Sequence, residues 1–371
     1  MRSFRRVAAY AAVGASLGLL STGVARAAEF NLGADDPIQR LKNEIDQIRL
    51  AQTRAKGPEA VGEAPARENS VQTTAVSGVL TRPGRLVIEP SIEYQHTDIN
   101  RFVAGGVAIL DTVLIGSFEA TRADRDSVTA TVAARYGVND RMEVETRVPY
   151  VYRHDSTTNT ILDSSTTTGR RTSSTTALGD VEFAARYQIT SGQGDWPFLI
   201  GNIRVKTPTG LGPYDVKRDD RGVEKELATG SGFWAIEPSM TAIIPDDPVV
   251  FFANVGYLVN LPKSIDKTIG GSRIGEVQLG NAVRFGFGIG IGLNEKTSLS
   301  IGYSHDFIAK TRSKIDDRNV YSEDLTIGTL SFGMNHQFSD KRSMDVSIGI
   351  GVTEDSPNVR LTVKFPFGID L

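Results

Sequence analysis

The sequence contains no cysteine and only four histidines among its 371 residues. Without cysteine the chain has no disulfides, no thiolate metal ligands and no cysteine to carry a lipid anchor. The histidines (His96, His154, His305 and His336) form neither a His-x-His nor a Glu-x-x-His pair of the kind that binds zinc. We therefore expect no metal and no other cofactor.

A hydrolase would need a serine, a histidine and a carboxylate that face one another. His305 lies between Ser304 and Asp306, which is the one compact cluster of this type in the sequence. Adjacent residues on a strand point to opposite faces, so His305 would share a face with neither neighbour. The sequence therefore predicts that the protein is not an enzyme.

Long apolar runs are also missing beyond the N-terminus. Three arginines precede a short apolar stretch at residues 7–20, and Ala25-Arg26-Ala27 is a small-residue cleavage motif. This arrangement is typical of a secretory signal peptide, with cleavage expected before Ala28. No later stretch approaches eighteen consecutive apolar residues, so we expect an exported protein without a membrane helix.

Neither sign of charge dominates the chain. It has 41 basic and 44 acidic residues, and loss of the four arginines in residues 1–27 leaves 37 basic against 44 acidic. An acidic excess argues against nucleic acid as a partner.

What the chain does contain is an alternation with a period of two, most clearly at its C-terminal end. From Leu361 to Leu371 every second residue is apolar, and the residues between are polar or small. Residues 344–352 and 283–291 repeat the pattern. Side chains of a strand alternate between its two faces, so the pattern suits lipid on one side and a wet lumen on the other. It predicts an all-β transmembrane barrel in a bacterial outer membrane.

Strands and turns are expected to alternate from Arg85 to the last residue. Short connections then alternate with long polar ones at 155–176, 208–228, 262–275 and 311–321, as in outer-membrane barrels. Residues 102–123 alternate poorly, and we interpret them as a first outer loop that partly extends its strands; two more strands there would give fourteen. The twelve expected antiparallel strands are 85–98, 124–138, 141–154, 177–190, 196–207, 229–244, 248–261, 276–292, 296–310, 322–338, 342–355 and 358–371.

The same parity predicts which charged side chains turn inward. Both signs occur in comparable number, which favours either a mutually paired interior that fills a narrow barrel or a wide polar duct. Glycines 286, 288, 290, 302, 349 and 351 are also expected inside, where they would leave the wall smooth. The predicted pore-lining residues are Glu89, Glu93, Arg135, Glu143, Glu145, Arg147, Glu182, Arg186, Arg204, Glu237, Arg284, Arg360 and Lys364.

The chain before the barrel divides into three parts: a signal peptide (1–27), a periplasmic helix or short coiled coil (28–55), and a linker with a possible plug (56–84). Ile38, Leu41, Ile45 and Ile48 recur at heptad spacing after Asp36-Pro37, a good helix start. Two heptads do not hold a helix alone in water. These four residues are the predicted seam of an oligomer, although a solitary amphipathic helix has the same pattern. Residues 71–80 would plug the lumen or hang beneath it.

Two stretches resemble a known family. They are residues 77–94 (SGVLTRPGRLVIEPSIEY) and residues 133–152 (AARYGVNDRMEVETRVPYVY). Both resemble outer-membrane barrels of the "MetA-pathway of phenol degradation" transporter-like family, and look closest to its branch of functional-amyloid secretion pores, which includes FapF. The resemblance covers roughly residues 77–371. It implies a twelve-stranded barrel, a plug, a periplasmic coiled coil, a homotrimer and export of unfolded amyloid subunits.

These observations leave three functions open. Export of an unfolded polypeptide is the first expectation, since a coiled coil below a pore suits the capture of a secreted chain. Uptake of small aromatic or hydrophobic compounds is the second, as the family name suggests, although it favours an apolar, aromatic-lined lumen and the inward positions are mostly charged or glycine. The third is a structural barrel that anchors the helix in the envelope.

Overall fold

A computed structural model describes residues 80–110, 113–162, 167–192, 196–218, 224–269 and 271–371. All of them belong to one compact unit, Arg49–Leu371. The expected signal peptide, the helix with its seam at Ile38, Leu41, Ile45 and Ile48, and the linker up to residue 79 lie outside the described residues.

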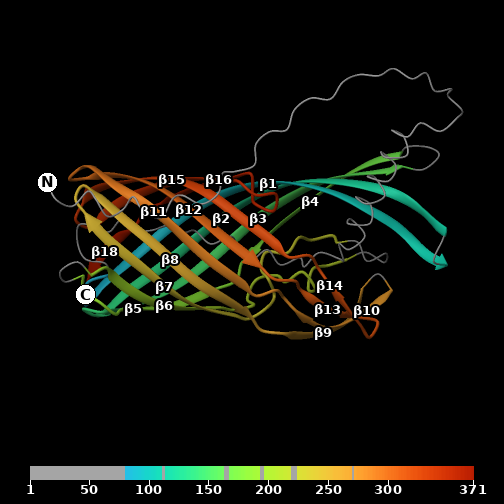
Figure 1. Ribbon diagram of the computed structural model, residues 1–371, viewed down its shortest axis with the longest axis horizontal. Helices are drawn as coiled ribbons and strands as arrows, with labels where there is room; N and C mark the ends of the chain where they lie inside the picture. The colour runs from blue at the N-terminus through green and yellow to red at the C-terminus, as the bar shows by residue number, and fades with distance from the viewer. Residues whose placement is uncertain (1–79, 111–112, 163–166, 193–195, 219–223, 270) are drawn as a thin grey trace, which may run out of the picture. The chain divides into compact units, whose positions relative to one another are not determined.

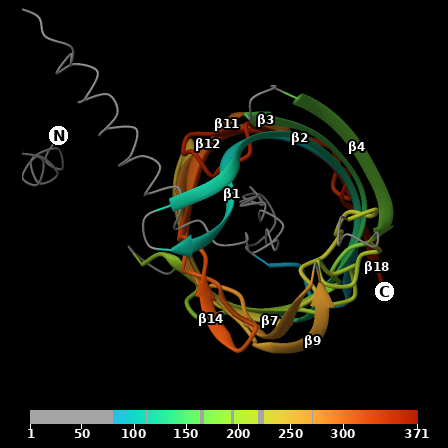
Figure 2. The same cartoon turned by 90° about the vertical axis from the view of Figure 1, so that its right-hand side faces the viewer.

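Antiparallel strands form a closed barrel, which Figure 2 shows end-on. The wall has twelve strand positions, two of which are each built from two collinear strands, β4 with β5 and β17 with β18. β1 closes the ring by pairing with β17 and β18. The strands of the wall are β1 (Arg85–Leu110), β2 (Val113–Asn139), β3 (Met142–Leu162), β4 (Thr167–Leu178), β5 (Glu182–Gln188), β6 (Phe198–Lys206), β7 (Ala235–Asp246), β8 (Val249–Asn260), β11 (Ala282–Asn294), β12 (Thr297–Ile308), β15 (Leu325–Ser339), β16 (Arg342–Gly351), β17 (Val359–Lys364) and β18 (Phe367–Asp370).

The two ends of the barrel differ (Figure 1). Short connections join β2 to β3, β7 to β8, β11 to β12 and β15 to β16 at one end, which we call the turn end. The described chain also begins and finishes there, and the Leu371 amide donates to the Gly84 carbonyl (3.0 Å). Asparagine closes two of these turns: the Asn139 side chain accepts the Arg141 amide and the Asn294 side chain accepts the Lys296 amide, both at 2.9 Å. The opposite end, with the long connections, is the loop end.

The twelve-stranded barrel predicted from the alternation is confirmed. Two expectations for the connections need correction. Residues 102–110 and 113–123 are not a loop: β1 runs on to Leu110 and pairs with β2, with one register shift between Ala108 and Leu110. The expected loops 262–275 and 311–321 contain hairpins that form a second, four-stranded sheet at the loop end. Its strands are β9 (Lys263–Ile269), β10 (Ser272–Gln278), β13 (Arg312–Ile315) and β14 (Arg318–Tyr321).

The barrel is apolar on the outside. Val255, Phe287 and Phe183 are exposed by 55%, 53% and 49%, and the residues next to them along each strand point inward. A water-soluble protein rarely exposes so continuous an apolar surface, whereas a barrel in lipid requires it. Tyr136 and Tyr187 lie on this surface near the turn end, as expected for an interfacial aromatic belt. The barrel is therefore built to span a membrane.

Within the described ranges there is no helix of the length and apolar character needed to cross a membrane.

Candidate functional site in the barrel interior

Alternating charges join neighbouring strands on the inner face, beginning near the turn end. Arg135 of β2 binds Glu89 of β1 (2.5 Å) and lies 3.7 Å from Glu145 of β3. Arg186 of β5 binds both Glu143 (2.5 Å) and Glu145 (2.9 Å). All these carboxylates are at least 95% buried. Lys364 of β17 extends the row by lying 3.9 Å from Glu89.

The row continues on the next strands towards the loop end. Arg204 of β6 binds Glu182 of β5 and Glu237 of β7. Glu237 also binds Arg284 of β11 (3.1 Å), although β8 lies between β7 and β11. Gly256 of β8 makes this long reach possible, because a Cβ there would lie 3.2 Å from the Glu237 carboxylate. Arg284 in turn lies 3.2 Å from Asp306 of β12. We call the whole row, from Lys364 to Asp306, the charge ladder.

The charge ladder rises obliquely through the barrel. Glu143 is the second residue of β3 and lies beside the turn end, whereas Arg284 is the third residue of β11 and lies beside the loop end. Cross-strand neighbours follow the hydrogen-bonding direction, and in a barrel the strand tilt makes that direction slant. The ladder thus occupies the turn end under β1–β3 and the loop end under β7–β12.

One row of residues on the inner wall, between the upper half of the ladder and the turn end, carries no charge. This row of cross-strand neighbours runs through β6, β7, β8, β11, β12, β15 and β16. It begins with three part-exposed apolar side chains and continues over residues with little or no side chain. In order these are Phe198, Ile243, Phe252, Gly288, Gly302, Ser331 and Gly349, and we call them the neutral strip.

The connection between β6 and β7 folds inward at the loop end. Its Leu227 amide donates to Thr175 of β4 (2.7 Å), and its Ala228 carbonyl accepts from Arg153 of β3 (3.2 Å). Thr175 and Arg153 share strand parity with interior residues, since Leu178 and Tyr152, which have the opposite parity on the same strands, are exposed outside. Residues 207–218 and 224–234, which we call the inner loop, thus lie against the inside of the wall.

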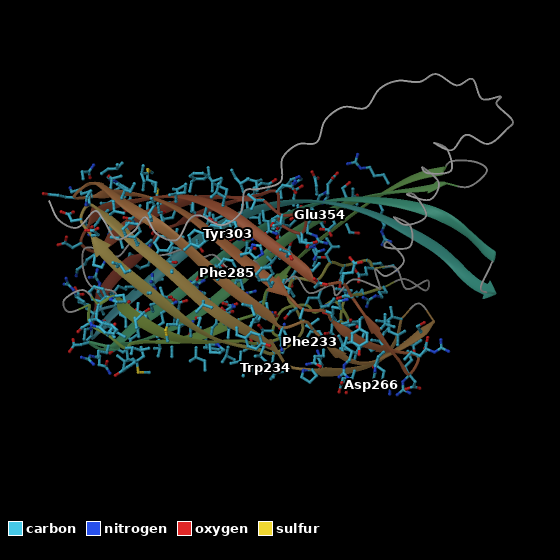
Figure 3. The ribbon with its side chains drawn as sticks, viewed as in Figure 1. Phe233, Trp234, Asp266, Phe285, Tyr303 and Glu354 are labelled. Atoms are coloured by element: carbon cyan, nitrogen blue, oxygen red, sulfur yellow. The ribbon has the colours of Figure 1, made fainter. Side chains whose placement is uncertain are left out.

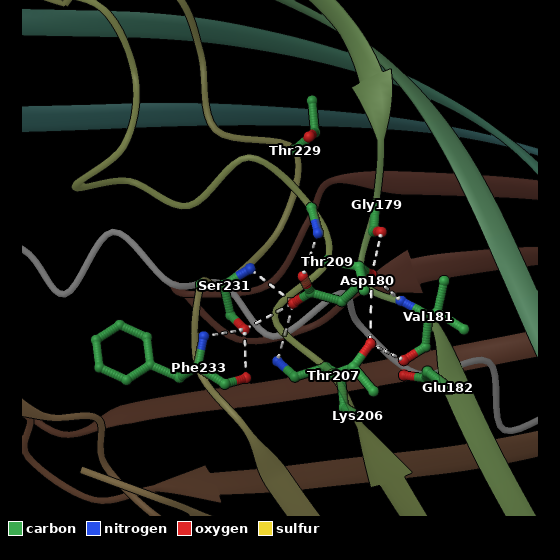
Figure 4. Close-up of polar contacts among 12 residues, drawn as sticks. Gly179, Asp180, Val181, Glu182, Lys206, Thr207, Thr209, Thr229, Ser231 and Phe233 are labelled. Atoms are coloured by element: carbon green, nitrogen blue, oxygen red, sulfur yellow. Dashed lines mark hydrogen bonds and ion pairs between the residues drawn. The ribbon is translucent and has the colours of Figure 1, made fainter. Parts of the chain in front are cut away.

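Asp180, in the break between β4 and β5, holds the neck of the inner loop (Figure 4). One carboxylate oxygen accepts the Gly210 amide (3.0 Å), and the other accepts the Ser231 amide (2.8 Å) and hydroxyl (2.7 Å). The Asp180 side chain is fully buried, and the Lys206 ammonium lies 3.7 Å away. Gly210 and Gly230 face each other so closely that a Cβ on either would meet the Cα of the other at 2.8 Å.

The second sheet anchors the other side of the inner loop. Phe233 packs with Val277 and Leu279 in a small apolar cluster that also includes Tyr214. Lys267 of β9 binds Asp215 (2.6 Å) and donates to the Tyr214 carbonyl (3.0 Å). The hydrogen bond from Lys267 holds the pKa of Asp215 below its ordinary value of 3.8. The inner loop is therefore fixed at two places.

A cavity of about 460 Å³ occupies the interior at the turn end. Residues of β1, β2, β3, β7, β8, β11, β12, β15, β16 and β18 line it, so it spans the lumen from wall to wall. Leu80, Thr81 and Arg82 also line it, and the Thr81 amide donates to Glu143 (2.8 Å). The described chain therefore approaches β1 from inside the barrel.

The sequence-predicted interior residues fall on one face of their strands. Most of them take part in the charge ladder, Arg147 extends it by binding Glu145, and Arg360 lies 3.6 Å from Glu93. Whether these residues line a conducting pore stays a prediction. Sequence reasoning missed Asp180, Gly256 and the inner loop, because their partners lie 30 to 51 residues away or on other strands. A lone Gly-Asp pair inside an expected strand was the available signal.

His305, the histidine of the Ser-His-Asp cluster, lies on the outer face of the barrel. The His305 ring stacks on Phe285 with centroids 5.4 Å apart, and its Nδ1 is 2.6 Å from the Tyr303 hydroxyl. Figure 3 shows Phe285 and Tyr303 on the wall formed by β11 and β12. Asp306 instead joins the charge ladder inside. Among the described residues no group of three or more histidines and carboxylates is placed to hold a metal ion.

No family model matches the chain. In structure it is similar to the COG4313 outer membrane channel from Pseudomonas putida F1, with 14% identity over 78% of this chain and 97% of that one and a TM-score of 0.53. Weaker matches include the transport unit of the autotransporter AIDA-I from Escherichia coli (8% identity, 76% of this chain, 89% of that chain, TM-score 0.41) and the P. putida toluene transporter TodX (7%, 79%, 93%, 0.35). The first match shows that this chain shares the fold of an outer-membrane channel.

Proposed function

We propose that the protein is an outer-membrane channel through which small, uncharged or weakly polar compounds, aromatic ones included, diffuse into the cell. The neutral strip is the observation that supports this reading best. It offers a path along which a solute meets Phe198, Ile243 and Phe252 and then glycine, without having to displace a buried ion pair. The apolar outer surface and the shared fold support the location.

The size of the interior favours small solutes. A cavity of about 460 Å³ lies in the range of small-ligand sites, roughly 300–1,000 Å³. The inner loop narrows the loop end further, since it is fixed to β3, β4 and β9. Passage of an extended polypeptide would need the inner loop to leave these contacts. Amyloid export, the first expectation from the sequence, is therefore less well supported than uptake and stays a prediction.

The interior charges also favour weak ion selectivity. The predicted pore-lining set contains seven cationic and six anionic side chains, and the ladder pairs them with one another. A lumen without a dominant sign should pass K⁺ and Cl⁻ at comparable rates.

Electrical recording tests the proposal. The full chain in planar lipid bilayers should give discrete current steps, and proteoliposomes should take up uncharged sugars of monosaccharide size faster than disaccharides. Deletion of residues 71–80 should raise the current if that segment acts as a plug. Sealed bilayers with both the full and the shortened chain would overturn the channel proposal and favour the structural barrel.

The trimer is a separate proposal. It depends on the heptad residues Ile38, Leu41, Ile45 and Ile48, and Ile45→Cys in this cysteine-free chain should cross-link copies to one another. If only monomers are found after cross-linking, the proposed oligomer seam is wrong.

A further inference from the structure

We propose that Phe252 forms a subsite for an uncharged planar ring on the inner wall of the barrel. This inference deepens the proposed channel function and rests on it. Phe252 belongs to β8, where exposed Phe251 and Val255 mark the outward face, so Phe252 points inward.

The glycines of the next two strands shape the floor under this ring. Phe252 pairs with Gly288 of β11, which pairs with Gly302 of β12. A Cβ on Gly288 would clash with the tip of the Phe252 ring, and a Cβ on Gly302 would lie 3.5 Å from the same tip. The ring therefore lies along the wall, over two strands, in space that only glycine at position 288 leaves free.

The surroundings favour a neutral ligand. The cross-strand neighbours of Phe252 are Ile243 on one side and Gly288 on the other, and Phe252 itself is part-exposed in the interior. Along this row the next charged side chain in the β11 direction is Arg360, after Ser331 and Gly349. A charged solute would lose hydration here without gaining a partner, whereas an aromatic ring gains an offset or edge-on contact with Phe252.

Glycine beneath an aromatic ring is also a known way to stabilise a sheet. That reading explains why the ring covers Gly288, but it gives no reason for an aromatic residue to remain part-exposed in the interior. Leucine would cover the glycine as well without offering a ring face. The two readings differ in one measurable respect, which is the preference for a ligand that carries a ring.

Phenyl β-glucoside and methyl β-glucoside test the subsite, since both are uncharged sugars and differ by the ring. Binding to the detergent-solubilised full chain is measured by ligand-observed NMR, which does not depend on conduction. The phenyl compound should bind roughly two- to tenfold more tightly than the methyl compound, the range that one aromatic contact provides. Phe252→Ala should abolish this preference, and Phe252→Leu, which keeps the apolar bulk, should abolish it too.

Phe251→Ala is the matched control, because it removes the same side chain from the adjacent, outward position. This variant should keep the preference for the phenyl compound. It also controls for any partition of that compound into the detergent. An equal preference in the wild type and in both Phe252 variants would overturn the subsite, as would no preference in the wild type. Absence of current in bilayers with an intact phenyl preference would instead count against the channel and leave the subsite standing.

Discussion

Asp180→Asn should release the inner loop. The wild-type carboxylate accepts three hydrogen bonds, from the Gly210 amide and from the amide and hydroxyl of Ser231, and it offsets the charge of Lys206. An asparagine has the same shape but only one acceptor oxygen, so its NH₂ group must face donors on one side. Losing hydrogen bonds to a charged group costs the closed loop about 3 kcal/mol, apart from the cost of leaving the Lys206 ammonium unpaired. That corresponds to roughly a 150-fold rise in the fraction of time that the loop is detached.

Thiol labelling measures this detachment, because the chain has no cysteine of its own. Leu227→Cys places a single thiol on the inner loop at a position that is 7% exposed and held by Thr175. Its reaction with a water-soluble methanethiosulfonate should be about two orders of magnitude faster in the Asp180→Asn background. Asp246→Asn, an exposed change at the turn end, is the control and should leave the rate unchanged.

A second change separates the loss of the latch from the burial of an unpaired lysine. Lys206→Met added to Asp180→Asn removes the ammonium, so thermal stability should recover while labelling stays fast. Single-channel conductance should rise in both variants. A labelling rate within threefold of the wild type would refute the role given to Asp180.

Three further outcomes are expected. Val255 lies at the middle of β8 and is 55% exposed, so Val255→Arg should destabilise the folded barrel by about 2–4 kcal/mol in urea titrations with vesicles. Val138→Arg, beside the turn end, should cost only about 0–1 kcal/mol. Equal costs for the two variants would argue against a lipid-facing belt. Gly256→Leu should separate the Glu237–Arg284 ion pair, which crosses β8, and destabilise the barrel by about 3 kcal/mol. Heat-modifiability gels should show this as a lower unfolding temperature. An unchanged unfolding temperature would show that the ion pair does not need the glycine. The pKa of Asp215 is lowered by its hydrogen bond from Lys267, so this tie is present above the ordinary value of 3.8 and is lost as the pH falls below it. Hydrogen exchange of residues 210–218, corrected for intrinsic rates, should accelerate only below about pH 4, and Asp215→Asn should show the fast exchange at every pH.

The alternation of apolar and polar residues was enough to predict most of the fold. Leu361 to Leu371 needed no tertiary information, because lipid outside and water inside impose a period of two on every residue of the segment. Residues 102–110 escaped the same reasoning since consecutive positions there are apolar, as in Phe102-Val103-Ala104. Their hairpin is held by backbone pairs, which leave no periodic signal in the side chains.

The interior could be predicted residue by residue but not pair by pair. Parity placed Glu237 and Arg284 on one face, but their contact also depends on strand tilt and on the missing side chain of Gly256. The inner loop was out of reach for a different reason. Its fixed points join Asp180 to Ser231 and Asp215 to Lys267, more than fifty positions along the chain, and single-sequence patterns carry no information at that separation.

The slant of the charge ladder has a consequence for ions in transit. A permeating ion never reaches one plane where all the fixed charges surround it at once. Because the row of ion pairs slants around the barrel, the ion passes the pairs one after another. Each charged side chain is already neutralised by its partner, so the electrostatic potential along the barrel axis varies little. Discrimination between solutes then depends on the shape of the lumen and on how well its surface is wetted, and both are set by the neutral strip.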